Sequence, residues 1–212
     1  MRKLICGPLP YLLVMSLACV ACSDDEVDSD EEARRAYLAL DKSIEKSLNL
    51  GFQGFNLATN ANIDVQTTTG NTAGTLAVDG QADQGSSDNK GMRLYIAMVD
   101  YDDGEVPYND DGDKVHIIFN TNTDVTMQPY LNLKFANYPN GTMTGTLDAN
   151  TNMTGVYTMT GDMEGTLNLN LMISGVTMAG TGTEVLRTPG MTTVTGTATN
   201  GDGGVYEINI TL

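Results

Sequence analysis

The chain has 212 residues, and its hydrophobic content of 41% is high enough for a buried core, so disorder throughout is excluded. Its formal net charge is −16, and apart from Arg2 and Lys3 nine basic residues face 27 acidic ones. Such a polyanion repels phosphate backbones and anionic lipid surfaces, which argues against nucleic-acid binding. Charged residues make up only 18% of the chain while Thr, Asn and Gly are frequent, which is typical of a β-protein with many turns.

The N-terminus has the layout of a signal peptide. Arg2 and Lys3 supply positive charge, residues 4–21 are uncharged and mostly apolar, and small residues close the run as at a cleavage site. The apolar run from residue 11 to residue 21 is shorter than the roughly 20 residues that a membrane span needs. We therefore predict that residues 1–21 are a signal peptide that the mature protein lacks.

All three cysteines, Cys6, Cys19 and Cys22, lie within the first 22 residues. The rest of the chain contains none, so it offers no intradomain disulfide, zinc-thiolate cluster or thiol nucleophile. The question that the cysteines raise is therefore whether one of them carries a lipid.

The stretch Cys19-Val20-Ala21-Cys22 resembles the lipobox of bacterial lipoproteins, a short apolar and small stretch that ends in the lipidated cysteine. Val20, Ala21 and Cys22 match that pattern, while Cys19 stands where leucine is usual. The competing frame over residues 16–19 places serine first and a bulky leucine second, so Cys22 is the predicted lipid attachment site.

The resemblance covers residues 1–22 only and implies a protein that acyl chains hold in a bacterial membrane. Ser23, rather than aspartate, follows Cys22, which in such lipoproteins implies sorting to the outer membrane. Ordinary secretion, with cleavage after Ala18 or Ala21, is the alternative. Each acyl chain contributes about 0.8 kcal/mol per buried CH₂, and stable anchoring needs more than one chain.

Residues 22–30 are predicted to be an acidic tether that stays solvated and holds the domain away from the membrane. Anionic headgroups repel this segment, so anchoring has to come from the lipid alone. The acidic residues of this stretch and of the adjoining helix start are Asp24, Asp25, Glu26, Asp28, Asp30, Glu31 and Glu32.

Residues 31–60 are predicted to form an amphipathic helix. The stretch from Ser29 to Glu32 has the S-x-x-E form of a capping box. Gly51 and Gly54 weaken the prediction beyond residue 50, because each costs about 1 kcal/mol relative to alanine in a helix interior. Apolar side chains recur every three or four residues and form one stripe: Tyr37, Leu40, Ile44, Leu48 and Phe55.

Two roles are open for that stripe. It can dock on the protein's own sheet, or it can bind a membrane surface or a partner protein. The opposite face carries Arg35, Lys42 and Lys46 among acidic residues and is not basic enough to gain much from lipid, which favours docking on the sheet.

From Asn62 onward the apolar period changes to two, which predicts an antiparallel β-domain over residues 61–212. We expect nine to eleven consecutive strands, forming one globular unit with the helix. The clearest strand runs are residues 92–98, 115–119, 131–135, 167–173 and 206–212, and the clearest turn signals are residues 79–80, 139–141 and 200–204.

The predicted fold class is therefore mainly β, a large curved antiparallel meander sheet or partial barrel packed against one long N-terminal helix. This outline resembles carrier-type periplasmic lipoproteins in which a helix caps an incomplete barrel. That likeness is one of architecture, and fold alone does not define function.

Met-Thr-Gly recurs at Met143, Met153 and Met159, with weaker echoes at Met163 and Met178, and the irregular spacing excludes a solenoid. A structural interpretation places these glycines where the sheet bends or bulges. A functional interpretation makes the methionines the lining of a soft groove for an apolar ligand.

The acidic loop between Asp100 and Asp113 places oxygen ligands near glycines, which suggests calcium, but it does not fit the EF-hand pattern. A solvated loop is the alternative. His116, the only histidine, lacks a nucleophile motif beside it, so a structural role is favoured. Asp162 and Glu164, two residues apart on an expected strand, are a weak candidate for a glycosidase pair, and the chain has no tryptophan to stack on a sugar.

The sequence predicts no catalytic residues, no bound metal and no cofactor. The leading interpretation is a lipid-anchored envelope protein with a non-catalytic structural or interaction role. The alternative is a carrier or binding module in which the helix and the curved sheet enclose an apolar ligand. An envelope hydrolase has the least support.

Overall fold

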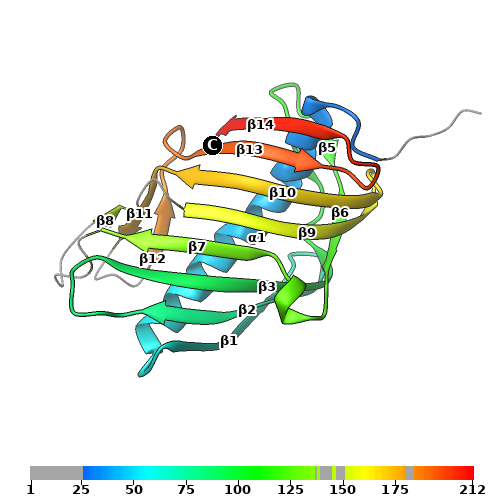
Figure 1. Ribbon diagram of the computed structural model, residues 1–212. Helices are drawn as coiled ribbons and strands as arrows, with labels where there is room; N and C mark the ends of the chain where they lie inside the picture. The colour runs from blue at the N-terminus through cyan, green and yellow to red at the C-terminus, as the bar shows by residue number, and fades with distance from the viewer. Residues whose placement is uncertain (1–25, 137, 139–144, 147–150, 180–183) are drawn as a thin grey trace, which may run out of the picture.

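The computed structural model describes residues 26–136, 138, 145–146, 151–179 and 184–212. Within them, one helix, α1 (Asp30–Leu57), crosses one face of a nine-stranded antiparallel sheet (Figure 1). The predicted fold class is confirmed. The strands of the large sheet are β1 (Asn62–Thr69), β2 (Ala73–Asp83), β3 (Lys90–Asp102), β6 (Ile117–Thr121), β7 (Tyr130–Phe135), β9 (Thr151–Gly161), β10 (Gly165–Ser174), β13 (Thr193–Thr199) and β14 (Val205–Thr211).

Shorter elements lie beside this sheet. A three-stranded and a two-stranded sheet raise the number of strands in the described residues to fourteen, above the nine to eleven expected, because these extra strands are only two to four residues long. A short 3₁₀ helix, η1, also lies beside the large sheet. These elements are β4 (Val106–Pro107), β5 (Lys114–Val115), η1 (Val125–Met127), β8 (Gly145–Thr146), β11 (Val176–Ala179) and β12 (Glu184–Arg187).

The large sheet is a meander with one interrupted strand. Its order is β1-β2-β3-β6-β9-β10-β13-β14, and β7 also pairs with both β3 and β9. Tyr101 of β3 faces Phe119 of β6, while Leu94 faces Leu131 of β7, so β6 and β7 lie end to end along the same neighbour. The η1 excursion separates the two halves (Figure 1).

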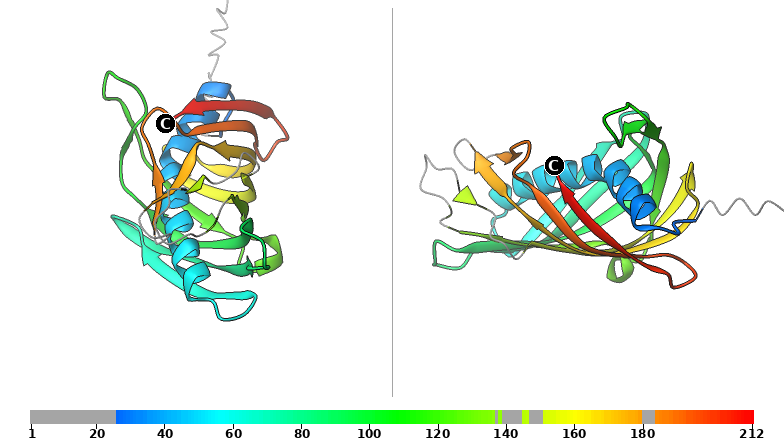
Figure 2. Two further views of the ribbon diagram at one scale, coloured as in Figure 1. Left: turned by 90° about the vertical axis from the view of Figure 1, so that its left-hand side faces the viewer. Right: turned by 90° about the horizontal axis from the view of Figure 1, so that it is seen from above.

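The sheet curls around the helix. Seen from above, α1 lies on the concave side of the sheet (Figure 2). The helix packs against β1 and β2 near one edge and against β14 at the other, so both edges of the sheet close on the same element. No helix in the described ranges has the length and apolar character needed to cross a membrane.

The start of α1 is fixed by hydrogen bonds among residues 28–32. The Ser29 hydroxyl accepts a hydrogen bond from the Glu32 backbone N–H at 3.3 Å, and the Glu32 carboxylate accepts one from the Asp28 N–H at 2.9 Å. This reciprocal pattern satisfies donors at the helix start, as in a capping box. The helix begins at Asp30 and ends at Leu57, where the prediction was residues 31–60, and the backbone turns extended at Ala58.

The predicted apolar stripe faces the sheet. Tyr37, Leu40, Ile44, Leu48 and Phe55 are each at most 1% exposed. Burying one such large apolar side chain stabilises the folded state by about 1.5–3 kcal/mol. The docking of the stripe on the protein's own sheet is therefore confirmed, and the stripe is not free for a membrane or a partner.

Gly51 marks the closest approach of helix and sheet. A Cβ added at this position would lie 2.2 Å from the Leu94 Cδ1 atom of β3. Leu94 is completely buried, so its side chain has little room to move. The glycine that weakened the helix prediction is what lets α1 lie this close to the sheet.

Aromatic rings close the core near the C-terminal end of α1. Phe52 and Phe55 stack on each other, and both meet Phe135 of β7 edge-on with ring centroids 5.4 and 5.1 Å apart. Edge-to-face pairs of this kind add about 0.5–1.5 kcal/mol beyond the burial of their area. Tyr138 packs edge-on against the same two helix residues.

The predicted tether is shorter than expected. Val27 is fully buried, its carbonyl accepts a hydrogen bond from the Asn200 side chain, and the Glu26 carboxylate accepts one from the Gly201 backbone N–H. Solvation of the whole stretch to residue 30 is therefore wrong for Glu26 and Val27, while Asp28 and Asp30 are exposed. One apolar residue among the acidic ones is enough to dock this segment beside the β13–β14 turn.

Two further sequence predictions need correction. The turn signal at Asp79 and Gly80 lies inside β2, where the glycine allows close contact, since a Cβ there would lie 1.8 Å from the Arg93 carbonyl oxygen. The strand run at residues 115–119 is split at His116, because β5 pairs with β4 while β6 joins the large sheet. The turn at residues 200–204 is confirmed. The turn signal at residues 139–141 lies outside the described residues.

We expect Gly51→Ala to lower the free energy of unfolding by about 1–3 kcal/mol, as overpacking does in a filled core. Helix propensity alone favours alanine by about 1 kcal/mol, so the two effects have opposite signs. Urea unfolding followed by circular dichroism measures the change. The exposed Gln53, on the same helix, supplies the control Gln53→Ala, which should shift stability by no more than about 0.5 kcal/mol. A Gly51→Ala protein more stable than wild type would contradict the packing argument.

Candidate functional site

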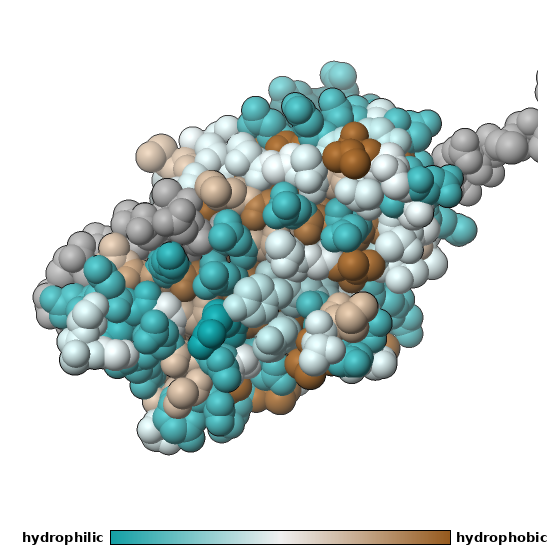
Figure 3. Space-filling model, viewed as in Figure 1, coloured by the Kyte–Doolittle hydropathy of each residue, from teal (hydrophilic) through white to brown (hydrophobic). Residues whose placement is uncertain are grey.

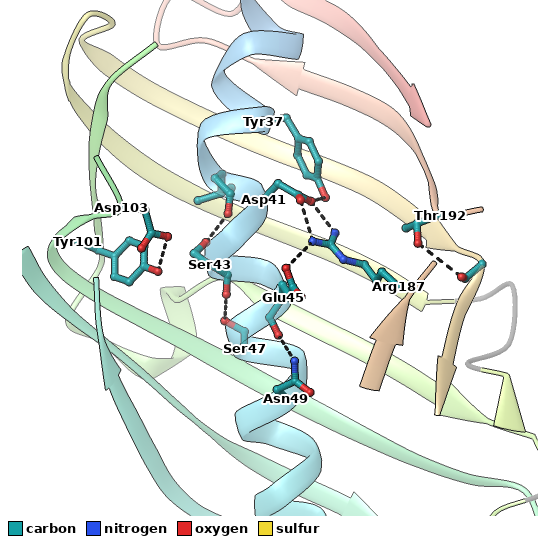
Figure 4. Close-up of polar contacts among 12 residues, drawn as sticks. Tyr37, Asp41, Ser43, Glu45, Ser47, Asn49, Tyr101, Asp103, Arg187 and Thr192 are labelled. Carbon is teal, nitrogen blue, oxygen red and sulfur yellow. Dashed lines mark hydrogen bonds and ion pairs between the residues drawn. The ribbon is translucent and has the colours of Figure 1, made fainter. Parts of the chain in front are cut away.

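Polar side chains gather at two places beside α1. We call the first the arginine cluster: Tyr37, Asp41 and Glu45, one helical turn apart on α1, and Arg187 at the end of β12 (Figure 4). The Arg187 guanidinium donates two hydrogen bonds of 2.7 Å to the two Asp41 carboxylate oxygens and a third of 3.3 Å to Glu45. The Tyr37 hydroxyl donates to the same Asp41 carboxylate at 3.1 Å.

Burial sets the electrostatics of the arginine cluster. The side chains of Arg187 and Asp41 are only 11% and 14% exposed. Burial by itself lowers the pKa of Arg187, but the hydrogen bonds and the charge of Asp41 outweigh it and raise that pKa. Burial, followed by the Asp41 charge, raises the pKa of Tyr37 well above its ordinary value. Arg187 therefore stays charged and the Tyr37 phenol stays protonated, and both of them hold the Asp41 carboxylate within the cluster.

The second group, which we call the lysine cluster, consists of Lys46, Asn71, Tyr101 and Asp103. The Lys46 ammonium donates to Asp103 at 2.6 Å and to the Asn71 side-chain oxygen at 3.1 Å. The Tyr101 hydroxyl donates to the other Asp103 oxygen at 2.6 Å, and the Asn71 backbone N–H donates to Asp103 at 2.9 Å. Lys46 was expected on the solvent side of the helix, but it reaches down to bind the loop after β3.

The Asp103 side chain is 2% exposed, and its carboxylate accepts three hydrogen bonds. Burial alone raises the pKa of Asp103, but hydrogen bonds from Lys46, Tyr101 and the Asn71 backbone together hold that pKa below its ordinary value. Burial and the bond to Asp103 raise the pKa of Tyr101 above its usual range. Among the described residues, every buried side-chain nitrogen or oxygen has a hydrogen-bond partner.

Several carboxylates of the acidic loop between Asp100 and Asp113 accept hydrogen bonds from the protein itself. Asp102 accepts from the Gly104 backbone N–H, and Asp113 accepts from the Asn109 side chain. Across the described ranges, no three His, Cys, Asp or Glu side chains lie together as a metal site. The solvated-loop interpretation fits these contacts better than a calcium site does.

His116 pairs with an aspartate rather than with a nucleophile. Its Nε2 atom lies 2.9 Å from Asp102 Oδ1, and the imidazole is 37% exposed. Asp162 accepts a hydrogen bond from the His116 backbone N–H. The glycosidase candidate Asp162 and Glu164 was expected on a strand, but both residues lie in the turn between β9 and β10.

The methionine repeat supplies core side chains. Met153 and Met159 point inward from β9, and Met178 from β11, each at most 2% exposed. Gly155 makes room for the Pro129 ring, and Gly161 has a φ of 118° beside the His116 carbonyl. The structural interpretation holds for these positions, while Met143 lies outside the described residues.

Cys22, the predicted lipid attachment site, also lies outside the described residues, as does the whole predicted signal peptide. Sequence reasoning missed both clusters, because Asp41 and Arg187 are 146 residues apart and Lys46 and Asp103 are 57 apart. The only local signal was the presence of polar residues beside the apolar stripe of α1.

Comparison of the chain with models of protein families, with curated proteins and with solved structures found no match. The function therefore has to be argued from the residues and the geometry.

We expect Arg187→Met to lower the free energy of unfolding by about 3–5 kcal/mol, because it leaves the buried Asp41 charge without its partner. The control is Lys114→Met, which removes an ion pair with Glu105 whose side chains are 52% and 64% exposed. That exposed pair should contribute no more than about 1 kcal/mol. Urea unfolding of both variants makes the comparison, and equal losses would show that the arginine cluster does not hold the helix.

The lysine cluster predicts a pH dependence of stability. Because the folded pKa of Asp103 lies below its unfolded value of about 3.9, the unfolded chain binds more protons and stability rises with pH. The contribution is complete above the unfolded pKa and is lost as pH falls through the folded pKa. We expect wild type to exceed Asp103→Asn in unfolding free energy at pH 7, with a difference that shrinks below about pH 4.

Urea unfolding of both proteins from pH 7 to pH 2.5 tests this. The exposed Asp111 supplies the control Asp111→Asn, whose difference from wild type should stay near zero at every pH. A wild-type advantage over Asp103→Asn that does not change with pH would refute the role assigned to the carboxylate charge.

Proposed function

We propose that this chain is a lipid-anchored protein of a bacterial cell envelope, attached through Cys22, whose β-domain has a non-catalytic structural or interaction role. The observation that carries the proposal is the lipobox-like stretch of residues 19–22 at the end of a signal-peptide pattern. Ser23 directly after Cys22 supports the outer membrane as the location. The β-domain begins almost at once, since Glu26 is already hydrogen-bonded to Gly201.

The short link has a geometric consequence for the anchored protein. Glu26 is four positions after Cys22. An extended chain spans at most about 3.3–3.6 Å per residue. A lipid on Cys22 would therefore keep the Glu26 backbone within about 14 Å of the attachment point, with the β13–β14 turn one side chain further on. The domain would sit beside the membrane surface rather than at the end of a long tether.

The closed polar clusters support a non-catalytic role. A general base or a nucleophile has to reach a substrate, whereas Asp41, Asp103 and Arg187 already use their polar atoms within the chain. The His116 side chain is 37% exposed, and Asp102 lies within hydrogen-bond distance of its Nε2 atom. These contacts fit residues that hold α1 and its neighbouring loops in place.

The carrier alternative needs an open space between helix and sheet. The side chains that would line it, including Met92, Met98 and Leu94, are at most 1% exposed and pack with the stripe of α1 in one continuous cluster. The protein's own side chains therefore occupy the position where a carrier would hold an apolar ligand. This packing favours the structural or interaction role.

Replacing the attachment residue tests the anchor. We expect Cys22→Ser to abolish metabolic labelling with an alkyne fatty acid and to move the protein from the membrane fraction to the supernatant. Cys19→Ser is the matched control and should retain both labelling and membrane attachment. Labelling that persists in Cys22→Ser but is lost in Cys19→Ser would move the site to Cys19. Absence of label in the wild type as well as in both variants would refute lipid anchoring.

A further inference from the structure

The unpaired cations of this acidic protein gather at one place. Nine lysine and arginine side chains lie in the described residues, and five of them make ion pairs: Arg34, Arg35, Lys46, Lys114 and Arg187. Four make none with a described residue, and these are Lys42, Lys90, Arg93 and Lys134. Three of the four, all except Lys42, line a single hollow.

The hollow lies on the outer face of the sheet, where β3 and β7 run side by side. It has a volume of about 580 Å³ and lies between Asp83, Asn89, Arg93, Asn132 and Lys134. The side of the sheet away from α1 faces the viewer in Figure 3, and hydrophilic residues predominate there. A hollow of this size is in the range of small-molecule sites.

Strand register explains how the hollow forms. Gly91 of β3 faces both Asp83 of β2 and Lys134 of β7, while Arg93 faces Asn132. Gly91 is buried and has no side chain, so it forms the floor between longer side chains on either side. Residues two apart on a strand share a face, which places Arg93 and Lys134 as diagonal neighbours over that floor.

The charges of the hollow select the ligand. Arg93 and Lys134 are exposed and have no carboxylate within ion-pair distance among the described residues, so each can receive an anionic group. Arginine binds a carboxylate with two parallel hydrogen bonds. Asp83 at the rim adds one negative charge, which disfavours a dianion such as phosphate but accepts hydrogen bonds from hydroxyl groups.

Side-chain amides and aromatic rings complete the chemistry. Asn89 and Asn132 each offer a donor and an acceptor to ligand hydroxyls. Tyr95 and Tyr130 face each other across β3 and β7 one step further along the same face, with ring centroids 5.4 Å apart. Such rings give a flat apolar surface with a polar edge next to the charged hollow.

We propose that this hollow binds a sugar acid, a ligand with one carboxylate and several hydroxyl groups, such as a hexuronate. Arg93 and Lys134 bind its carboxylate, and Asp83, Asn89 and Asn132 bind its hydroxyls. A ligand with a single negative charge suits the site. At physiological salt the Debye length is about 8 Å, so the acidic residues elsewhere on the surface are screened and the nearby Arg93 and Lys134 dominate the attraction. The proposal does not depend on lipidation of Cys22.

Isothermal titration calorimetry on the full-length protein, purified in mild detergent, tests the proposal with sodium D-galacturonate and neutral D-galactose. We expect galacturonate to bind at least about tenfold more tightly than galactose, and Arg93→Gln and Lys134→Gln each to weaken it about tenfold, as loss of a charged hydrogen bond implies. Lys42→Gln is the matched control, because Lys42 is also unpaired but lies on α1 outside the hollow, and it should bind as wild type does.

Inorganic phosphate distinguishes a sugar-acid site from a general anion site. Asp83→Asn should tighten phosphate binding more than galacturonate binding, because it removes a negative charge that repels the dianion more strongly than the monoanion and leaves one acceptor oxygen for the hydroxyls. Thermal melting of each variant checks the fold, and the amide resonance of Gly91 reports whether the ligand sits in the hollow. Absence of galacturonate binding, tighter binding of phosphate than of galacturonate to wild type, or an equal loss in Lys42→Gln would each overturn the proposal.

Discussion

The burial of one helical stripe on the concave face of the sheet is the interaction on which the rest of this structure depends. The sheet presents a row of large apolar side chains to that side, and α1 is the element that covers them. Because β1, β2 and β14 all pack on the helix, the curvature of the sheet and the position of the helix determine each other. Gly51 sets how closely they approach, since Leu94 occupies the space where a side chain would stand.

Apolar packing alone does not fix the rotation of a helix on a sheet, and the two polar clusters supply that information. Asp41 and Lys46 are five residues apart, so at 3.6 residues per turn they point to different sides of α1. Arg187 holds one side of α1 to β12, and Asp103 holds the other side to the loop that follows β3 (Figure 4). Rotation of the helix in either direction would break a buried ion pair, and breaking such a pair costs several kcal/mol.

Periodicity predicted the parts of this fold that local patterns determine. The change from a period near 3.6 to a period of two, close to Asn62, located both the helix and the sheet. Local signals failed where a distant strand decides the outcome. Asp79 and Gly80 have the composition of a turn, yet they continue β2 because the glycine accommodates a neighbouring carbonyl.

The polar contacts were less predictable than the elements. The pairing of Asp41 with Arg187 joins residues 146 positions apart, and no spacing in the sequence identifies it. The same holds for Arg93 and Lys134, which come together because β3 pairs with β7. The segment at residues 26–30 was predicted to be solvated because most of its residues are acidic. Its position is instead determined by its one apolar residue, Val27, which is buried.

The contacts of that segment also bear on when the chain can fold. Glu26 and Asp30 bind the backbone N–H groups of Gly201 and Glu207, 175 and 177 residues later. Glu26 and Asp30 thus find these partners only in β14 and the turn before it, and the helix lacks part of its cover until β14 exists. Contacts of such large sequence separation slow folding, because the chain must close a long loop before any energy is gained. A ribosome makes the chain from its N-terminus, so the core is complete only after the last two strands have been synthesised.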